Sequence, residues 1–411
     1  MIQPLSGIKV LDLTRVVAGP LCTQMLCDSG ATVYKIERPK TGDDTRAMGP
    51  FIKDRSGDVN ASSVFMAYNR GKKSLAIDFS QPEGAKLVRG LAQQCDVVVE
   101  NFKAGGLSKY GLDYESIKVD NPGVIYCSLS GFGQNGPYAQ YPAYDFVMQG
   151  LAGLMSTCGH GDESPGGGPM RTAIPISDIV SGMTAAITLF GALFQRQRTG
   201  QGQYIDTSLL DAAVALNGHL AVGYLLTGQE HQRVGNRNPI ASPSELFDCA
   251  DGQLIIAVGN NSQFLTLCSI LGVPEVAEHK LFKTNALRVK NRDALRECLD
   301  ELLKQYNSTE LIDALRQQGV PAGPVNTMQD VFNDPQVQHR ALTATIHDPK
   351  YDMPLHLLNT PLRYEKGRAA PVAPPLLGEH TAQVLAQELS LSEEALQILI
   401  NDGVVDTVLE A

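Results

Sequence analysis

Residues 8–36 read IKVLDLTRVVAGPLCTQMLCDSGATVYKI, and this stretch decides the fold. The run at 8–13 is apolar and β-branched, and a second apolar segment extends from Pro20 to Cys27. After Gly30, a further run of strand type occupies 31–36. This order predicts a strand, a helix and a second strand.

The same alternation continues along the next hundred residues. Strand-type runs occur at 74–79, 96–101 and 124–129, and Pro82 opens a helical segment that extends to Gln94. Strands that alternate with helices build a parallel sheet covered on both faces. We therefore predict the α/β class, with an open, mostly parallel, Rossmann-like sheet.

A long helix is predicted at 177–198, where apolar residues recur at helical spacing. Ser177 is the expected N-cap, and Gly200 is expected to end the helix. A second helix is expected at 209–226.

Composition changes after this point and predicts a smaller α+β domain. The region 245–320 combines a strand at 253–258 with amphipathic helices. The sequence Pro-Ala-Gly-Pro at 321–324 is typical of a linker.

The charge and the cysteines exclude several classes of protein. The chain has 411 residues, with 34 Lys and Arg against 44 Asp and Glu, a formal charge of −10. Nucleic acid and anionic membranes attract basic surfaces, so we expect neither as a partner. The eight cysteines form no Cys-x-x-Cys pair, which argues against a disulfide framework or a metal site. The sequence shows no leader pattern and no uninterrupted apolar run of membrane length, so a cytoplasmic location is expected.

An anion site is the first functional hypothesis. The turn at 14–20 lacks the three glycines of a dinucleotide-binding fingerprint, which argues against a nicotinamide cofactor. Arg38 and Arg46 follow the second strand, where open α/β sheets bind ligands. Either a phosphate-rich ligand or solvent contacts the whole basic cluster, which comprises Lys35, Arg38, Lys40, Arg46, Arg70, Lys72 and Lys73.

Asp178 is the candidate nucleophile. It follows the expected N-cap of the helix at 177–198, where free backbone N–H groups and the helix dipole favour an ionised carboxylate. Such a carboxylate can attack an activated acyl group, or it can serve only to stabilise its helix. Asp145 could likewise be only a helix cap. The chain has neither an HExxH nor a GxSxG motif, which argues against common zinc and serine hydrolases.

Eight short motifs follow one another through the chain. They are LSGIKVLDL at 5–13, AGP at 18–20, KIERP at 35–39, GDDTR at 42–46, NRGKKS at 69–74, VENF at 99–102, GFGQNGP at 131–137 and PLLGEHT at 375–381. Through these motifs, the sequence resembles the class III CoA-transferase family over essentially its whole length.

The resemblance implies a domain arrangement and a set of site residues. Residues 1–225 and 325–411 would form a large α/β CoA-binding domain, with a small domain at 226–324 and two chains interlocked as a homodimer. The nucleophile of the family falls on Asp178, and Tyr144 and Asp145 complete the catalytic group. The residues expected to contact CoA are Val16, Arg38, Lys72, Asn101, Phe102 and Lys109.

The implied reaction moves CoA from an acyl-CoA, such as succinyl-CoA, to a small carboxylic acid, with a dicarboxylate as the expected acceptor. Asp178 would form a mixed anhydride and then an aspartyl-CoA thioester. CoA is a substrate, and no tightly bound cofactor or metal is expected. Arg46 and Arg171 are candidates to hold the distant carboxylate of the acceptor, although surface or phosphate contacts explain them equally well.

Two alternatives remain open. In the racemase branch of the family a histidine stands where this chain has Tyr144, so the base that would remove an α-proton is missing. This difference favours CoA transfer over racemisation or other α-proton chemistry. A non-catalytic CoA-binding protein, in which Asp178 serves only its helix, is the alternative from another class.

Overall fold

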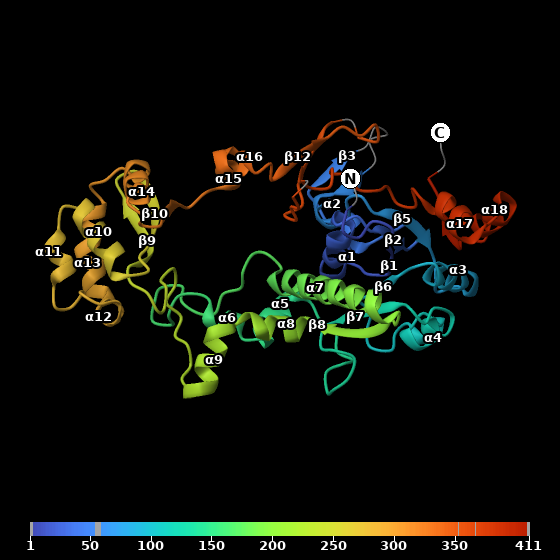
Figure 1. Ribbon diagram of the computed structural model, residues 1–411, viewed down its shortest axis with the longest axis horizontal. Helices are drawn as coiled ribbons and strands as arrows, with labels where there is room; N and C mark the ends of the chain where they lie inside the picture. Colours follow the sequence, from blue (N-terminus) through green and yellow to red (C-terminus); the bar gives the residue numbers. More distant parts are fainter. Residues whose placement is uncertain (1–2, 54–58, 352, 366, 409–411) are drawn as a thin grey trace. The chain divides into compact units, whose positions relative to one another are not determined.

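Backbone contacts divide the chain into two units, and both chain ends belong to the first (Figure 1). The computed structural model describes residues 3–53, 59–351, 353–365 and 367–408. The predicted domain limits at 226 and 324 differ from this division, because the second unit also takes in a short early segment and extends beyond the expected linker. The first unit comprises Met1–Leu154, Thr172–Leu226 and Gln338–Ala411, and the second comprises Met155–Arg171 and Thr227–Val337.

A seven-stranded sheet forms the centre of the first unit, with the order β14-β5-β2-β1-β6-β7-β8. All neighbours are parallel except β14, which is antiparallel to β5. The α/β class and the Rossmann-like, mostly parallel sheet are therefore confirmed. The strands are β1 (Lys9–Asp12), β2 (Thr32–Glu37), β5 (Lys73–Ile77), β6 (Val97–Glu100), β7 (Ile125–Ser130), β8 (Gln203–Ser208) and β14 (Val405–Asp406).

The order of the strands fixes where a ligand can bind. From the central β1 the chain proceeds to β2 and β5 on one side, and it then crosses over to β6, β7 and β8 on the other. The direction of winding therefore changes between β1 and β6. In open parallel sheets, the crevice at the carboxyl ends of two such strands is the preferred place for a ligand.

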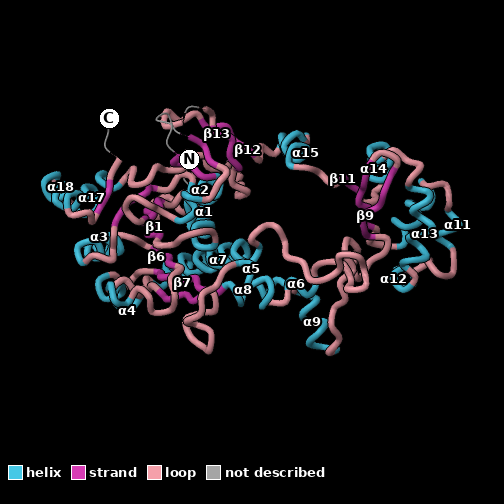
Figure 2. Tube along the Cα trace, turned by 180° about the vertical axis from the view of Figure 1, so that it is seen from behind, coloured by secondary structure: helices cyan, strands magenta, loops and turns pink. Residues whose placement is uncertain are grey.

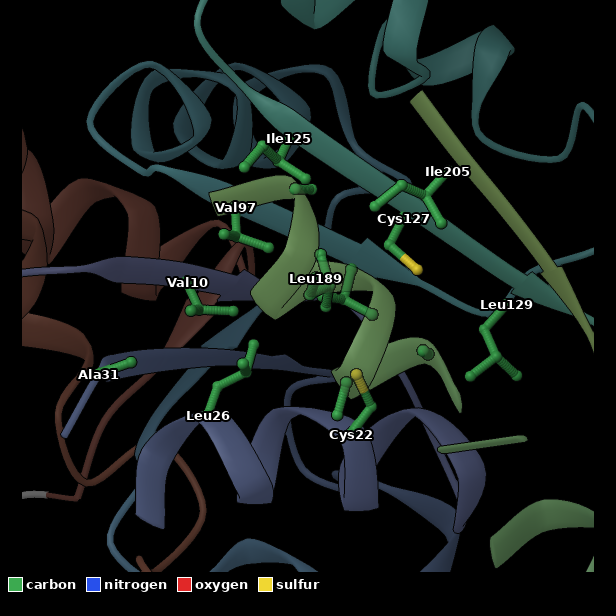
Figure 3. Packing of buried hydrophobic residues seen from close by; sticks show 14 of the residues in the cluster. Val10, Cys22, Leu26, Ala31, Val97, Ile125, Cys127, Leu129, Leu189 and Ile205 are labelled. Carbon is green, nitrogen blue, oxygen red and sulfur yellow. The ribbon is translucent and has the colours of Figure 1, made fainter. Parts of the chain in front are cut away.

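Helices cover both faces of this sheet, because successive strand residues point to opposite sides. Val10 and Val97 pack under α1 (Ala18–Asp28) and α7 (Ile176–Thr199), as Figure 3 shows. On the other face, Leu11 belongs to a second apolar cluster. Its helices are α3 (Pro82–Gln93), α4 (Tyr114–Asp120), α17 (Thr381–Leu389) and α18 (Glu393–Asn401), and Figure 2 shows the same layers from behind.

Helix α7 is long and apolar enough to cross a bilayer by length and composition, and so is the bent pair α8 (Leu209–Leu216) and α9 (Gly218–Thr227). In its most apolar window, 44% of α7 is buried, and the helix packs on α1 and β7. The expectation that no membrane is involved remains a prediction.

The prediction of a single helix at 209–226 is wrong, because the segment forms two helices, α8 and α9, with a bend of 77° between them. Gly218 has a φ of +50°, which interrupts the helix. The Asn217 amide donates to the Ala152 and Ala213 carbonyls at 2.8 and 3.2 Å. Apolar periodicity continues through the bend, and it therefore could not reveal the break.

In the second unit, a three-stranded antiparallel sheet of order β11-β10-β9 packs on helices. The expected linker at 321–324 is wrong, because Ala322–Pro324 forms β11 and Gly323 pairs with Ile255. Proline can occupy an edge strand, so this Pro-Gly-rich segment still pairs. The unit contains β9 (Ser244–Cys249), β10 (Gly252–Ala257), α10 (Asn261–Ile270), α11 (Pro274–Glu278), α12 (Asn285–Lys290), α13 (Arg292–Leu303), α14 (Ser308–Gln317), α15 (Met328–Asn333) and part of α16 (Pro335–His339).

The remaining elements are short. They are the 3₁₀ turns η1 (Asp44–Ala47) and η2 (Ser108–Tyr110), the strands β3 (Phe51–Lys53), β4 (Val59–Ser62), β12 (Thr343–Ile346) and β13 (Leu355–Leu358), and the helices α2 (Ser63–Asn69), α5 (Asp145–Leu151) and α6 (Leu154–Thr157).

Candidate active site

A cavity of about 530 Å³ lies at the carboxyl ends of β1, β6 and β7, at the switch point of the sheet. One wall is the turn after β1, from Arg15 to Ala18, and another is the loop after β6, from Asn101 to Lys109. Asp178 of α7 also lines the cavity. All of these residues belong to the first unit.

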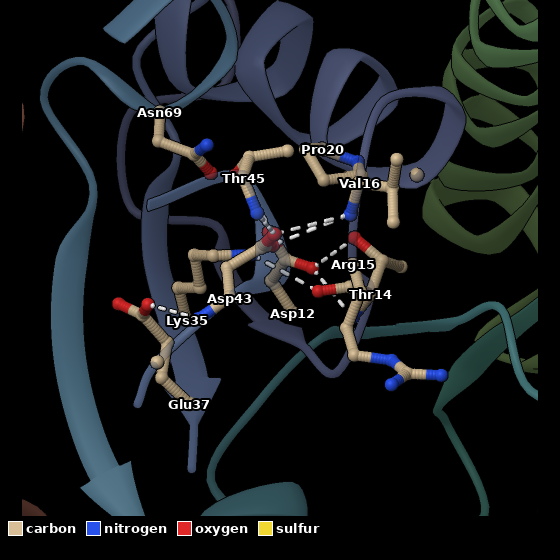
Figure 4. A network of polar contacts seen from close by, with 12 residues as sticks. Asp12, Thr14, Arg15, Val16, Pro20, Lys35, Glu37, Asp43, Thr45 and Asn69 are labelled. Carbon is tan, nitrogen blue, oxygen red and sulfur yellow. Dashed lines mark hydrogen bonds and ion pairs between the residues drawn. The ribbon is translucent and has the colours of Figure 1, made fainter. Parts of the chain in front are cut away.

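The turn after β1 is held by buried and half-buried side chains (Figure 4). The Thr14 N–H donates to Asp12 at 2.9 Å, and the Arg15 N–H donates to the Asn101 amide oxygen at 2.9 Å. The Val16 N–H points at the Asp43 carboxylate, 3.3 Å from each oxygen. The wall of the cavity is therefore fixed from behind.

Close helix packing brings Asp178 to this turn. A Cβ atom on Gly182 would lie 2.5 Å from the Ala18 carbonyl oxygen, so only glycine lets α7 approach the start of α1 this closely. Asp178 precedes Gly182 by four residues and therefore lies on the same side of α7. The helix contact thus presents Asp178 to the cavity.

The environment of Asp178 differs from the one expected. Helix α7 begins at Ile176, and its N-cap position is Pro175, so Ser177 is not the cap. Burial, together with the negative charge of Asp145, raises the pKa of Asp178 to about 7. The helix end therefore does not set the protonation of Asp178, because burial and a second carboxylate outweigh the dipole.

Asp145 connects the starts of two helices and is only 8% exposed. One carboxylate oxygen accepts the Ser177 N–H of α7 at 2.8 Å, and the other accepts the Gln149 amide at 2.8 Å. Asp145 therefore fixes the first turn of α7, which carries Asp178. Tyr144, the N-cap residue of α5, is 71% exposed and lines the cavity.

Four of the six predicted CoA contacts line the cavity: Val16, Asn101, Phe102 and Lys109. The Asn101 amide is already engaged, because it accepts the Arg15 N–H and donates to the Arg15 carbonyl at 2.8 Å. Its side chain thus shapes the turn. Arg38 lines a smaller adjoining pocket that shares Arg15 and Phe102 with the cavity.

The prediction for Lys72 is wrong on geometric grounds. Lys72 is 2% exposed, and its ammonium group forms an ion pair with Asp12 at 3.0 Å. It also donates to Thr23, to the Asn69 amide oxygen and to the Pro20 carbonyl. All three N–H groups are engaged in the interior, so Lys72 supports β1 and α1 and leaves none for a ligand phosphate.

The two candidates for the distant carboxylate have different outcomes. The prediction that Arg46 holds the distant carboxylate is wrong. Its guanidinium group already forms a bidentate ion pair with Glu37 at 2.7 and 2.8 Å, and it stacks on Phe65. Arg171 is exposed and belongs to the second unit, whereas Asp178 belongs to the first. Its role remains a prediction.

Sequence reasoning missed two basic residues of the cavity, Arg15 and Lys103. The Arg15 guanidinium lies 5.1 Å from the centre of the Phe102 ring. Each of the two basic residues lies within three positions of the end of a strand, at the edge where open α/β sheets bind ligands. This position could have identified both. Two further aromatic residues, Phe79 and Tyr110, complete that side of the cavity.

The lining of the cavity therefore combines two kinds of chemical group. Arg15, Lys103 and Lys109 can meet phosphates, and the aromatic rings beside them can stack on a planar base. Asp178 offers a carboxylate for acyl chemistry. Within the ranges that the structure describes, no group of three or more His, Cys, Asp or Glu residues could hold a metal ion.

Comparison with known proteins agrees with this geometry. The model of the family described as CoA-transferase family III matches residues 5–381. The chain therefore belongs to this family and is a family III CoA-transferase. It is 44% identical to a succinate–glutarate CoA-transferase of Agrobacterium fabrum, over 93% of this chain and 95% of that protein. It is 39% identical to a human succinyl-CoA:glutarate CoA-transferase, over 98% and 90% of the two chains.

Solved structures show the same fold. A CAIB/BAIF family protein from Brucella suis superposes with a TM-score of 0.83 at 42% identity, covering 94% of this chain and all of that one. The Rv3272 protein of Mycobacterium tuberculosis superposes with a TM-score of 0.81 at 30% identity, covering 92% and 98% of the two chains.

Proposed function

We propose that this protein transfers CoA from succinyl-CoA to a dicarboxylic acid such as glutarate, with Asp178 as covalent nucleophile. The names of the relatives from Agrobacterium fabrum and human support this choice of substrates. One observation carries the proposal: the carboxylate of Asp178 shares a cavity with the basic and aromatic groups that suit a CoA thioester.

The chemistry proceeds in two pairs of steps. An Asp178 oxygen attacks the thioester carbonyl, and the C–S bond breaks to release CoA thiolate and leave an aspartyl mixed anhydride. The thiolate then attacks the Asp178 carbonyl, which forms an aspartyl-CoA thioester and releases succinate. The acceptor carboxylate attacks this thioester, and the thiolate released again attacks the acceptor carbonyl to give the new acyl-CoA and free Asp178.

Local electrostatics supports this role. Burial and Asp145 raise the pKa of Asp178 to about 7, so near neutral pH its charged form is present and poorly solvated. No hydrogen bond or ion pair of the Asp178 side chain occurs among the described residues. A carboxylate that is neither paired nor well hydrated is a stronger nucleophile than one held by a cation.

The acceptor must present its reacting carboxylate to Asp178. Glu37 neutralises Arg46, so Arg46 is not free to hold the distant carboxylate. Arg171 is kept as the proposed contact on the sequence prediction alone. The expected test is an Arg171→Gln variant whose KM rises for glutarate while its KM for succinyl-CoA is unchanged. A monocarboxylate acceptor should be insensitive to this change.

The covalent step can be tested directly by mass spectrometry. The protein is incubated with succinyl-CoA, with and without hydroxylamine, and peptides are searched for an aspartyl hydroxamate. We expect it at Asp178 in the native chain and nowhere in Asp178→Ala. Asp44→Asn is the comparison variant, because Asp44 is another carboxylate that lines the cavity, where it pairs with Arg15. It can alter CoA affinity, but at saturating succinyl-CoA the adduct should still form on Asp178.

Two other outcomes would replace the proposal. Exchange of the α-hydrogen of an acyl-CoA with deuterated water, without adduct, would indicate racemase-like chemistry. CoA binding without adduct, exchange or transfer to any acid in a panel would indicate a binding protein.

We also propose the interlocked homodimer. Its support is the exposed apolar surface of α7 and α9 in a single chain, which includes Ile187, Phe194, Leu225 and Leu226. Light scattering after size-exclusion chromatography tests it, and a mass equal to one chain would contradict it.

A further inference from the structure

Val16 has a backbone conformation that is unfavourable for its side chain. Its φ is +69°, in the left-handed region that β-branched residues rarely occupy. Lys40, Ala341 and Ser390 are the other non-glycine residues with positive φ in the described ranges, and none of them lines the cavity. The strained residue therefore belongs to the wall of the candidate CoA site.

Asp43 is placed to hold this conformation. Both of its carboxylate oxygens lie 3.3 Å from the Val16 nitrogen, although 27 residues separate the two positions in the sequence. Asp43 does not line the cavity of Asp178. Asp43 does line the smaller adjoining pocket of Arg38, but its side chain is fully buried. An effect of Asp43 on a ligand in the cavity therefore passes through Val16 or its neighbours.

Several groups fix the Asp43 carboxylate. The Lys35 ammonium group lies 2.9 Å away, and both side chains are fully buried. The Thr45 N–H and hydroxyl donate to Asp43 at 2.9 and 2.8 Å. The Asp43 N–H donates to Glu37 at 3.0 Å. Figure 4 shows this chain of contacts behind the turn.

Charge keeps the carboxylate an acceptor. Burial alone would raise the pKa of Asp43, but Lys35 and the hydrogen bonds from Thr45 outweigh it and lower the pKa to about 2. Lys35 also donates to the Thr14 carbonyl at 3.0 Å. The Lys35–Asp43 pair therefore holds the turn at Thr14 and at Val16.

We propose that Asp43 is a positioning residue for the CoA thioester: it holds Val16 in the left-handed conformation and so shapes the wall of the cavity against which the ligand binds. This inference rests on the proposed function of the cavity. It assigns to Asp43 and Lys35 a role in substrate affinity that reaches the ligand only through the backbone.

A double-mutant cycle tests the route through Val16. The four proteins are the native chain, Asp43→Asn, Val16→Gly and the double variant, and each is assayed for KM of succinyl-CoA, kcat and calorimetric Kd of free CoA. Glycine adopts a positive φ without steric cost, so in Val16→Gly the turn no longer needs the Asp43 carboxylate to keep this conformation. We expect Asp43→Asn to raise Kd and KM about tenfold when Val16 is present and less than about threefold in the Val16→Gly background.

Two further variants separate positioning from folding. Asp43→Glu keeps the charge beside Lys35 and moves the carboxylate by one methylene, so it tests the proposal if Asp43→Asn fails to fold; its KM should rise with kcat little changed. Asp113→Asn is the control, because Asp113 is likewise an N-cap carboxylate: it accepts the Ser116 N–H at the start of α4 and does not line this cavity. Its KM should not change.

The outcomes are distinct. Equal losses from Asp43→Asn in the native chain and in the Val16→Gly background would overturn the proposal, and so would an unchanged KM in folded Asp43→Glu. If the native chain binds no CoA, or if Asp178→Ala keeps full transfer, then the proposed function fails first. The melting curves of all variants report folding separately from these constants.

Discussion

Asp43 and Asp178 are two carboxylates near the same turn, one behind the cavity wall and one inside the cavity. Asp43 lies 2.9 Å from the Lys35 ammonium group, and its pKa is lowered to about 2. Asp178 has Asp145 as its charged neighbour, and burial with that neighbour raises its pKa to about 7. The aspartate side chain behind the wall is thus paired and fixed in position, whereas the aspartate side chain in the described part of the cavity is unpaired.

The difference shows what a partner does to a carboxylate. A buried carboxylate with a cation gains a fixed position and a permanent charge, which suits a structural role. A buried carboxylate without one keeps its charge only at a cost, and it can lower that cost by reacting with an acyl group. The chemistry open to each aspartate therefore depends on its neighbours.

Removal of the unpaired carboxylate should have the largest effect on activity. Asp178→Asn should lower kcat by about 10⁴-fold or more, because no covalent intermediate can form. Its melting temperature at pH 8 should stay equal or rise, since burial disfavours the charge that is removed. Steady-state transfer assays and calorimetry check both parts. A residual rate within tenfold of the native one would refute the role of Asp178.

Removal of a paired cation should instead destabilise the fold. Lys72→Met leaves Asp12 buried without its nearest counter-charge, and we expect a loss of about 3–5 kcal/mol in the free energy of unfolding. Denaturant titration measures it. The folded fraction should still bind CoA, because Lys72 does not line the cavity. A tenfold weaker affinity with native stability would return Lys72 to the set of ligand contacts.

Removal of the neighbouring charge should move the pH profile of the reaction. The nucleophile must be ionised, so the rate of adduct formation should rise with pH and level off above about 7. Asp145→Asn removes the like charge and should shift the midpoint down by up to about one pH unit, while burial keeps it above the usual value near 4. Rapid-quench adduct yields across pH 5–9 check this. An unchanged midpoint would show that Asp145 does not face Asp178 electrostatically.

Acid should reveal the paired carboxylate. Because the pKa of Asp43 is lowered by folding, its ionised form stabilises the native state above about pH 4, and this contribution is lost as the pH falls towards about 2. Asp43→Asn should therefore have a flatter stability curve between pH 4 and pH 2. Urea midpoints measured at several pH values test the slope, and parallel curves for the two proteins would contradict it.

The smallest effect is expected at the surface. Arg89 forms an ion pair with Asp120 at 2.7 Å, and both side chains are substantially exposed. Water and salt screen such a pair, so Arg89→Gln should cost less than about 1 kcal/mol in the free energy of unfolding. A cost near that of Lys72→Met would show that burial does not separate the two kinds of pair.

The sequence by itself determined the sheet and the candidate nucleophile. Apolar, β-branched runs and their alternation with a helical segment identify β1, α1 and β2, because burial on both faces of a parallel sheet leaves near-continuous apolar runs. Motifs across the chain identified the CoA-transferase family and Asp178. Arg15 follows β1 in the same pattern and could have been found from that position.

Only the tertiary structure decided which charged residues are available to a ligand. Lys72 and Arg46 look like phosphate or carboxylate contacts in the sequence, yet Asp12 and Glu37 occupy them. The raised pKa of Asp178 likewise comes from burial and from Asp145, which lies 33 residues away along the chain. The interaction of two charges depends on the distance between them in space and on their exposure to solvent. The local sequence gives neither quantity, so ion pairing and pKa values are set only when the chain is folded.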